Sequence, residues 1–295
     1  NLSATGDSKS LSTNVNTGIA GTISGVYDER KSNIEFNGKS NQIIPGTVFA
    51  GNKIKNVVVS NNVILGGQDT VLGKISFGNV NNKTFTTGGY LTLKSNAINT
   101  ASIGDLTNNG VNSGNTISGN VTVERFLSSL NNRAYRLLGP SVNTTTNIHA
   151  NWQEGATSAV HNPTPGYGTH ITGSLIDQTN GFDRTITAQQ SLFTYNQTAS
   201  GWVAINNTNV STLNAVTGYL LYIRGDRTID LTSQANPLPS TNATLRATGT
   251  VQTGNQIFSG LAGNNKFSLI TNPYPSAINW TSIQTNSSGI SLATK

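Results

Sequence analysis

The sequence predicts an all-β protein in which a short parallel β-helix-like (solenoid) region is followed by an antiparallel β-sandwich domain. Charged residues make up only 10% of the 295 residues, against about 25% in an average soluble domain, so few segments could form helices with a charged outer face. No segment shows a sustained 3.6-residue apolar period. Short apolar segments instead recur between turns rich in Asn and Gly, which is the pattern of short strands.

Residues 1–32 are predicted to form an extended N-terminal arm, because Ser, Thr, Asn, Gly and Ala dominate its composition. Ile19, Ile23 and Val26 mark one strand-like stretch in this arm. An arm too polar to fold alone can add a strand to the sheet of a neighbouring molecule. Ile19 and Ile23 then point to one face, whereas Val26 does so only if a bulge intervenes. The alternative is an unstructured tail or an inter-domain linker.

Residues 33–119 are predicted to form the β-helix-like region. Short apolar segments recur here at intervals of about ten to twenty residues, namely 34–36, 57–59, 75–77, 91–93 and 101–103. In a parallel β-helix each rung stacks on the previous one, and Asn or Gly occupies the corners. Because the period is irregular, a short meander is the alternative.

Residues 120–295 are predicted to form the β-sandwich (jelly-roll-like) domain, because the strands are longer and carry most of the aromatic residues. The predicted strands are 121–127, 134–138, 192–195, 202–205, 218–224, 244–251 and 266–270. Two hairpins are expected, one joining the first two strands and one joining the next two. The strand at 218–224 is continuously apolar, which predicts burial on both faces. Its expected neighbours in the core are Tyr135, Phe193, Trp202 and Leu269.

Composition excludes several classes of function. The chain has no Cys, which excludes a disulfide scaffold, a Cys-ligated zinc site and a thiol nucleophile. The net charge is +6, but no run of Lys and Arg exceeds two residues. A nucleic-acid partner is therefore not expected, because such a surface needs clustered cations. No apolar run approaches the ~18 residues of a membrane span, so none is predicted.

No catalytic or cofactor-binding site is predicted, and the chain is not expected to be an enzyme. The sequence has no Gly-X-Ser-X-Gly elbow and no Gly-X-Gly-X-X-Gly loop, the motifs of many hydrolases and dinucleotide-binding proteins. The acids of the β-helix-like region are Glu35, Asp69 and Asp105, each isolated in the sequence. Polysaccharide hydrolysis needs paired carboxylates. A polysaccharide-active enzyme nevertheless remains the third hypothesis.

Residues 147–173 hold the richest collection of potential ligand-binding side chains, namely His149, Trp152, Glu154, His161, Tyr167 and His170. The histidines are spaced by twelve and nine residues and lack the short pair typical of zinc sites, so no metal site is predicted. Trp152 and Tyr167 are the candidates for stacking on a sugar ring, but a position in the core beside Gly and Pro turns is the favoured interpretation of Trp152. The integrin-type tripeptide Arg224-Gly225-Asp226 is expected to be a turn at the end of a strand.

Six sequence motifs between roughly residues 88 and 280 resemble, in their order, large surface proteins of the Bacteroidetes group. The motifs are Gly-Tyr-Leu-Thr-Leu-Lys-Ser at 89–95, Ile-Ser-Gly-Asn-Val-Thr-Val-Glu-Arg-Phe at 117–126, Arg-Ala-Tyr-Arg-Leu-Leu at 133–138, Gly-Thr-His-Ile-Thr-Gly at 168–173, Gly-Tyr-Leu-Leu-Tyr-Ile-Arg-Gly-Asp-Arg at 218–227 and Phe-Ser-Leu-Ile-Thr-Asn-Pro-Tyr-Pro at 267–275. The resemblance implies export by the type IX secretion route and display on, or release from, the outer membrane.

Members of this group typically carry a C-terminal sorting domain, which is not found after the last motif. The resemblance therefore implies either a fragment of a longer protein or a processed tail. It supplies no catalytic residue. Thr70, in Asp69-Thr70-Val71, matches the Asp-Ser/Thr-apolar pattern that the same bacterial group O-glycosylates, and Thr70 is the candidate modification site.

These observations predict an extracellular structural protein of the bacterial cell surface, a self-associating subunit of a fibre or sheath that forms filaments. The alternative is a surface adhesin or glycan-binding module of a longer secreted protein, with surface glycans as its partners. Ordered filaments of the purified protein would distinguish the first hypothesis from the second.

Overall fold

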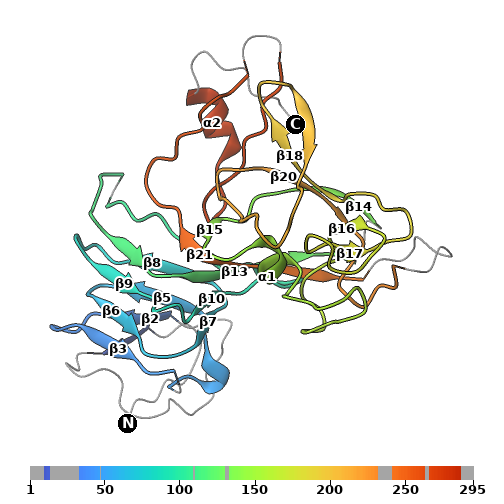
Figure 1. Ribbon diagram of the computed structural model, residues 1–295. Helices are drawn as coiled ribbons and strands as arrows, with labels where there is room; N and C mark the ends of the chain where they lie inside the picture. Colours follow the sequence, from blue (N-terminus) through green and yellow to red (C-terminus); the bar gives the residue numbers. More distant parts are fainter. Residues whose placement is uncertain are drawn as a thin grey trace.

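The computed structural model describes residues 10–13, 33–46, 48–108, 110–129, 133–231, 241–262 and 266–286 (Figure 1). Strands make up 37% of the structure and helices 6%. The predicted all-β class is therefore confirmed. Within the described residues, no helix is long and apolar enough to cross a membrane.

Three stacks of parallel strands form the N-terminal half of the described chain. Sheet 1 has the order β1-β2-β5-β8-β11, sheet 2 has the order β3-β6-β9-β12, and sheet 3 contains β4, β7, β10 and β13. The strands are β1 (Ser10–Thr13), β2 (Asn33–Phe36), β3 (Gln42–Ile44), β4 (Lys53–Ile54), β5 (Asn56–Val59), β6 (Val63–Leu65), β7 (Asp69–Val71), β8 (Lys74–Phe77), β9 (Thr84–Thr86), β10 (Leu91–Leu93), β11 (Ser102–Ile103), β12 (Thr116–Ser118) and β13 (Val121–Leu127). From β2 onward, every three consecutive strands contribute one strand to each sheet.

Apolar side chains stack in register through these sheets. In sheet 1, Ile34 pairs with Val57 and Val57 with Ile75, and all three are buried. Alternate residues of each strand point inward, so even strands of three or four residues bury two apolar side chains. Each fully buried Val, Ile or Leu contributes about 1.5–3 kcal/mol, which makes the stack the main source of stability in this half.

Asparagine side chains join successive layers at the turns. Asn56 Oδ1 accepts a hydrogen bond from the backbone N–H of Lys74 at 2.7 Å, and Asn62 Oδ1 accepts one from Thr84 at 2.9 Å. Asn115 Oδ1 accepts a third from Lys83 at 2.9 Å. A short polar side chain that bonds to neighbouring backbone satisfies a turn without lengthening it. These hydrogen bonds at the turns explain why Asn is abundant in the sequence.

β13 joins the parallel strands to the rest of the molecule. One edge of β13 pairs in parallel with β10, and the other pairs antiparallel with β21 (Ala243–Val251) over seven residues. β15 (Val142–Thr144) pairs with the far edge of β21. The expected hairpin between β13 and β14 (Ala134–Leu138) is therefore wrong, because β10 and β21 occupy both edges of β13.

A second antiparallel sheet, sheet 4, has the order β14-β20-β18-β19. The expected hairpin of β18 (Leu192–Asn196) and β19 (Gly201–Ala204) is confirmed. β20 (Tyr219–Ile223) is the predicted apolar strand, but burial alternates along it, so the expectation of two buried faces is wrong. The expected strand at 266–270 is also wrong. Leu269 exchanges two hydrogen bonds with the side-chain amide of Gln197, at 2.8 and 3.1 Å, in place of a strand partner.

The remaining elements are short. Helix α1 (Ile148–Trp152) is capped by Asn147, whose Oδ1 accepts from the backbone N–H of Ala150 at 2.8 Å. β16 (Thr172–Ser174) and β17 (Asp183–Arg184) form a two-stranded parallel sheet, and α2 (Trp280–Asn286) lies near the end of the described chain. In Figure 1, β3 lies at the lower end of the parallel stacks and β18 and β20 lie at the opposite end of the molecule.

The structure gives a partial account of the predicted N-terminal arm. Within the arm, Ser10–Thr13 forms β1, which pairs in parallel with β2 of the same chain. Ile19, Ile23 and Val26, the candidate strand-donor residues, lie outside the described residues.

Candidate functional site: an aromatic face on sheet 4

One face of sheet 4 is covered by aromatic and aliphatic side chains. Residues directly opposite one another in an antiparallel pair lie on the same face. Tyr135 lies opposite Tyr222, Phe193 lies opposite Leu220, and Tyr195 lies opposite Trp202. The aromatic face therefore consists of Tyr135, Leu137, Phe193, Tyr195, Trp202, Leu220 and Tyr222, drawn from all four strands.

The rings on this face contact one another and remain partly open to solvent. Tyr135 lies 5.0 Å from Tyr222 and 6.3 Å from Phe193 between ring centroids, and Tyr195 lies 5.2 Å from Trp202. Tyr135 is 50% exposed and Trp202 is 46% exposed. Large exposed apolar surfaces of this kind mark interaction sites in soluble proteins.

The opposite face of sheet 4 packs into the core. Tyr219, Leu221 and Ile223 of β20 are buried there, and the Tyr219 ring meets the edge of Trp152 at 5.4 Å. The expectation that Tyr135 and Trp202 surround β20 in the core is therefore wrong. Tyr135 lies on β14, next to β20, and Trp202 lies on β19, two strands away, but both side chains project from the outer face of the sheet.

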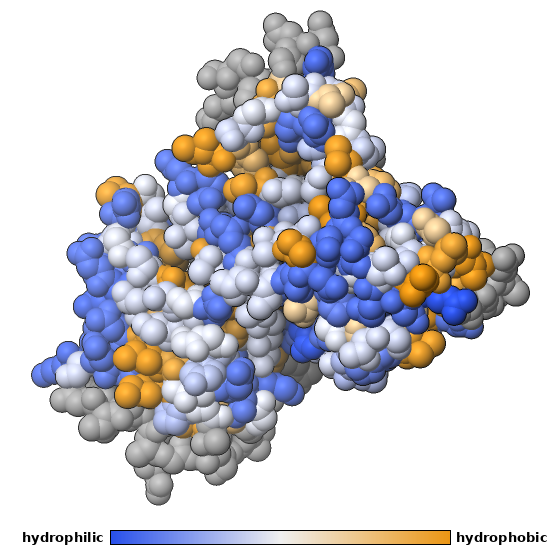
Figure 2. Space-filling model, in the orientation of Figure 1, coloured by the Kyte–Doolittle hydropathy of each residue, from blue (hydrophilic) through white to orange (hydrophobic). Residues whose placement is uncertain are grey.

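Other parts of the described chain border the Tyr195 end of the aromatic face. Near Tyr195, a hollow of ≈ 250 Å³ is lined by Phe258, Leu261 and Leu269 among others. Figure 2 shows apolar side chains at several places on the visible surface, including the upper part of the molecule, where Figure 1 places β18 and β20.

Two arginines lie at the other end of the aromatic face. Arg224 directly follows β20, and its guanidinium lies 4.7 Å from the ring centroid of Tyr222. Arg133 directly precedes β14. In the described part of the chain, Arg133 Nε and Arg224 Nη1 are buried and have no hydrogen-bond partner. Burial lowers the pKa of Arg224, and the positive charge of Arg133 lowers it further.

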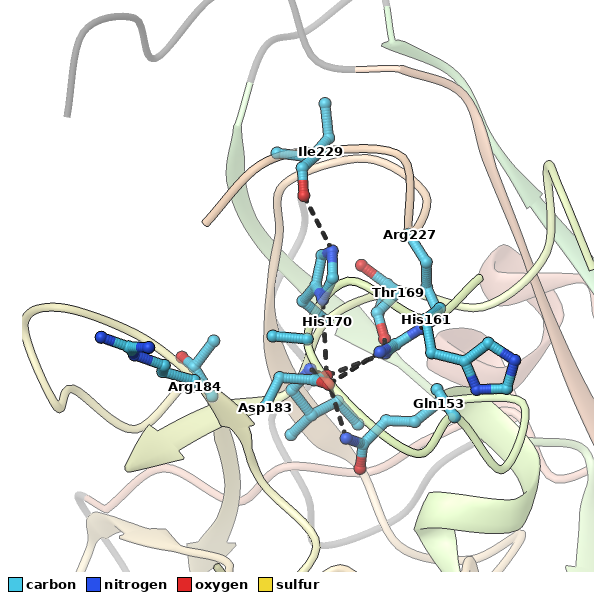
Figure 3. Close-up of polar contacts among 12 residues, drawn as sticks. Gln153, His161, Thr169, His170, Asp183, Arg184, Arg227 and Ile229 are labelled. Carbon is cyan, nitrogen blue, oxygen red and sulfur yellow. Dashed lines mark hydrogen bonds and ion pairs between the residues drawn. The ribbon is translucent and has the colours of Figure 1, made fainter. Parts of the chain in front are cut away.

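A different arginine, Arg227, lies in a buried cluster in which each of its three guanidinium nitrogens has an acceptor (Figure 3). Its Nη1 and Nη2 atoms donate to the two carboxylate oxygens of Asp183 at 2.8 and 2.7 Å. Its other hydrogen bonds go to the carbonyls of His161, Thr169 and Ser158. The guanidinium thus holds the loop at 158–169 against β17.

Asp183 is also held by neighbours other than Arg227. Gln153 Nε2 donates to it at 3.0 Å, and the backbone N–H of Ile171 donates at 3.1 Å. His170 donates from Nε2 to the carbonyl of Ile229 at 3.0 Å, while its Nδ1 lies 3.5 Å from the Asp183 carboxylate. Burial opposes ionisation of Asp183, but hydrogen bonds from Arg227 and His170 hold its pKa at about 2.

The Asp–His pair in this cluster is not placed for catalysis. Asp183, His170 and Gln153 are fully buried, and Arg227 is 2% exposed, so a substrate has no route to them in this structure. The neighbouring Asp226, from the Arg-Gly-Asp tripeptide, is also buried and accepts hydrogen bonds from Thr228 and Thr241. The tripeptide is therefore a structural turn, as expected, and not an exposed loop tip.

The two candidate sugar-stacking residues have internal contacts. Trp152 is buried against Tyr219, as the favoured interpretation of the sequence expected, so it is not an exposed platform for a sugar. Tyr167 has two cations against its ring, with Lys94 Nζ at 5.0 Å and Arg246 Cζ at 4.4 Å from the centroid. Hydrogen bonds to Tyr167 and Glu124 outweigh burial and raise the pKa of Lys94. A hydrogen bond to Glu154 raises that of Arg246.

The remaining candidates are dispersed. His149 Nε2 contacts the carbonyl of Ala156 at 2.8 Å, and His161 Nδ1 accepts from the backbone N–H of Thr157 at 3.0 Å. Among the described residues, no group of three potential metal ligands comes together. Thr70, the candidate O-glycosylation site, lies half-buried in the middle of sheet 3, between Lys53 and Thr92 on the adjacent strands.

A cleft of ≈ 1050 Å³ lies beside the last strands of sheets 1 and 2. One wall is formed by residues 102–107 and 114–116, and the other by residues 252–255 and 274–277. The two walls touch where the backbone N–H of Ile103 donates to the carbonyl of Pro275 at 3.0 Å. β12 is the last strand of sheet 2, and no strand of the described chain pairs with its other edge.

Comparisons of the chain with protein-family models, with curated proteins and with solved structures find no match. Sequence reasoning placed the strands of sheet 4 but missed its aromatic face. The sequence did contain a signal for this face. Tyr135 and Leu137 alternate along β14, Tyr222 and Leu220 alternate along β20, and the two pairs lie opposite each other.

Proposed function

We propose that this chain is an extracellular, non-enzymatic surface protein whose aromatic face on sheet 4 binds glycans. The observation that carries the proposal is the half-exposed row of five rings and two leucines on one sheet face. Aromatic side chains offer large, rigid, amphipathic surfaces, and the C–H faces of sugar rings stack on such surfaces. The opposite face of sheet 4 packs into the core, so the strands that carry the rings are already in place before a ligand binds.

Three acids of the described chain have structural partners, which supports a binding role rather than catalysis. Glu124 pairs with Lys94, Glu154 pairs with Arg246, and Asp183 pairs with Arg227. Each of these carboxylates is committed to a structural ion pair, and none belongs to the aromatic face. Glycoside hydrolysis needs two carboxyl groups about 5–10 Å apart around the scissile bond.

We further propose that sheets 1 to 3 form a β-helix and that sheet 4 belongs to a β-sandwich. The three-strand recurrence of sheets 1 to 3 is the order expected if they are the sides of a parallel β-helix, and sheet 4 is the expected first layer of a β-sandwich. Such a rod would project the aromatic face away from its lower end. The resemblance to surface proteins of Bacteroidetes supports an extracellular location.

Self-association into filaments is the second candidate, favoured by the edge of β12. An unpaired edge is a template for strand addition, and Thr116 at the start of β12 lines the cleft. In this second candidate function, β12 would accept the arm of a neighbouring molecule.

The glycan-binding proposal is tested by affinity electrophoresis on a panel of neutral and acidic polysaccharides. Tyr135→Ala should weaken binding about tenfold, because central aromatic residues carry most of the energy of an interface. Tyr90→Ala is the matched control, since Tyr90 is a partly exposed ring beside β10, outside sheet 4. Equal loss in the two variants, or retention by no polysaccharide, would contradict the proposal.

A further inference from the structure

We infer that the glycan is acidic, and that Arg133 and Arg224 bind a carboxylate or sulfate group at one end of the aromatic face. This inference rests on the proposed function and adds the chemical class of the ligand.

The register of sheet 4 brings the two arginines together. Ala134 lies opposite Ile223 and Tyr135 lies opposite Tyr222. Continuing this antiparallel register by one residue places Arg133 opposite Arg224, on the same face as the two tyrosines. Like charges directly opposite one another destabilise a strand pair. A bound anion removes that repulsion.

The two guanidinium groups also lack the carboxylate partner that three other cations of the described chain have. Arg227, Arg246 and Lys94 each form an ion pair with a carboxylate. Arg133 and Arg224 form none with the described residues, and each leaves one buried N–H donor unpaired. A buried donor without a partner destabilises the folded protein. Burial, and to a lesser degree the positive charge of Arg133, lowers the pKa of Arg224.

The geometry favours a carboxylated or sulfated sugar. A guanidinium presents paired donors that match the two oxygens of a carboxylate. Arg224 lies against the Tyr222 ring, so an anionic group bound there belongs to a ligand whose ring can reach Tyr222 and Tyr135. A single-stranded nucleic acid needs cations along its whole track, whereas the face beyond this pair carries uncharged residues.

The test compares polygalacturonic acid with its fully methyl-esterified form, which has the same backbone without the charge. The wild-type protein should bind the acid about tenfold more tightly. Arg133→Gln and Arg224→Gln should each abolish most of this preference, and binding of the ester should be retained. Arg184→Gln is the matched control, because Arg184 is exposed on β17, outside sheet 4. Tyr135→Ala should weaken binding of both polymers.

Two further readouts separate binding from folding. Removing one of two like charges should leave the melting temperature unchanged or raised, and the acid, but not the ester, should raise that of the wild type. Equal affinity for both polymers would overturn the inference and leave the proposed function standing, whereas binding of neither would overturn both. Competition by polyuridylate as strong as by the acid would also overturn the inference.

Discussion

At the residue scale, the buried carboxyl group of Asp69 lacks the kind of partner that ion-paired acids such as Asp183 have. Asp69 is 1% exposed and points into the interior of sheet 3, where neither carboxyl oxygen has a hydrogen-bond partner among the described residues. Burial raises its pKa from 3.8 to about 7. The sequence showed Asp69 as an isolated acid, but only the strand alternation of β7 shows that it points inward while Thr70 points out.

Asp69 makes stability depend on pH in a predictable direction. Between about pH 4 and pH 7 the unfolded chain releases the proton while the folded chain keeps it, so stability falls as the pH rises through this range. Above about pH 7 the loss is complete and amounts to about 4 kcal/mol at most. Asp69→Asn removes the charge and should stabilise the protein at pH 8 but hardly at pH 4. Urea unfolding at both values checks this.

The control for this prediction is Asp105→Asn, since Asp105 is exposed and its carboxylate contacts only Thr107 in the adjoining turn. This variant should keep the wild-type fall in stability between pH 4 and pH 8. If Asp69→Asn keeps it too, the burial of a charged Asp69 is not its cause.

At the element scale, the sequence predicted the strands of sheet 1 well and missed most of the shorter strands. The expected segments at 34–36, 57–59, 75–77 and 91–93 all lie in strands of sheets 1 and 3. All of sheet 2 (β3, β6, β9 and β12) was missed, as were β4 and β7, because a strand of two or three residues carries almost no periodic signal even when it is apolar, as β6 is.

The irregular spacing of the sequence segments has a structural cause. In sheet 1, Val57 follows its partner Ile34 by 23 residues, Ile75 follows Val57 by 18, and Ile103 follows Ile75 by 28. Turns of different length account for the difference, while the stacked register stays constant. The hairpin of β13 and β14 was mispredicted because turn signals identify a reversal of the chain but not the partner of each strand. Pairing depends on contacts distant in sequence, such as those of β13 with β21.

The N-terminal strand supplies a test at the same scale. Because β1 pairs with β2 of its own chain, deleting residues 1–28 should expose the edge of β2 and lower stability by about 1–3 kcal/mol, the value of a few backbone hydrogen bonds. Hydrogen exchange of the β2 amides should accelerate accordingly. Deletion of residues 1–9 alone, which leaves β1 in place, should change neither. Unchanged exchange in the longer deletion would show that β1 is dispensable to its own chain.

At the scale of the whole molecule, the buried core and the proposed binding surface lie in different parts of the structure. The stacked parallel strands share one apolar core, and Arg227 and Asp183 form a buried ion pair. Sheet 4 instead exposes rings and leaves two arginines without partners. The sequence indicated a surface protein through composition and family resemblance, but it pointed to Trp152 and Tyr167 as binding residues. Trp152 could not be told from Trp202 without knowing which strand face is covered.

The most direct test of glycan binding at the aromatic face is a fluorescence titration with polygalacturonic acid. Trp202 lies on the aromatic face, whereas Trp152 is buried beneath sheet 4 and Trp280 lies on α2. We expect a saturable change in tryptophan emission that is lost in Trp202→Phe and kept in Trp280→Phe. A saturable change that persists in Trp202→Phe, or the absence of any change in the wild-type protein, would contradict the assignment of the aromatic face as the binding site.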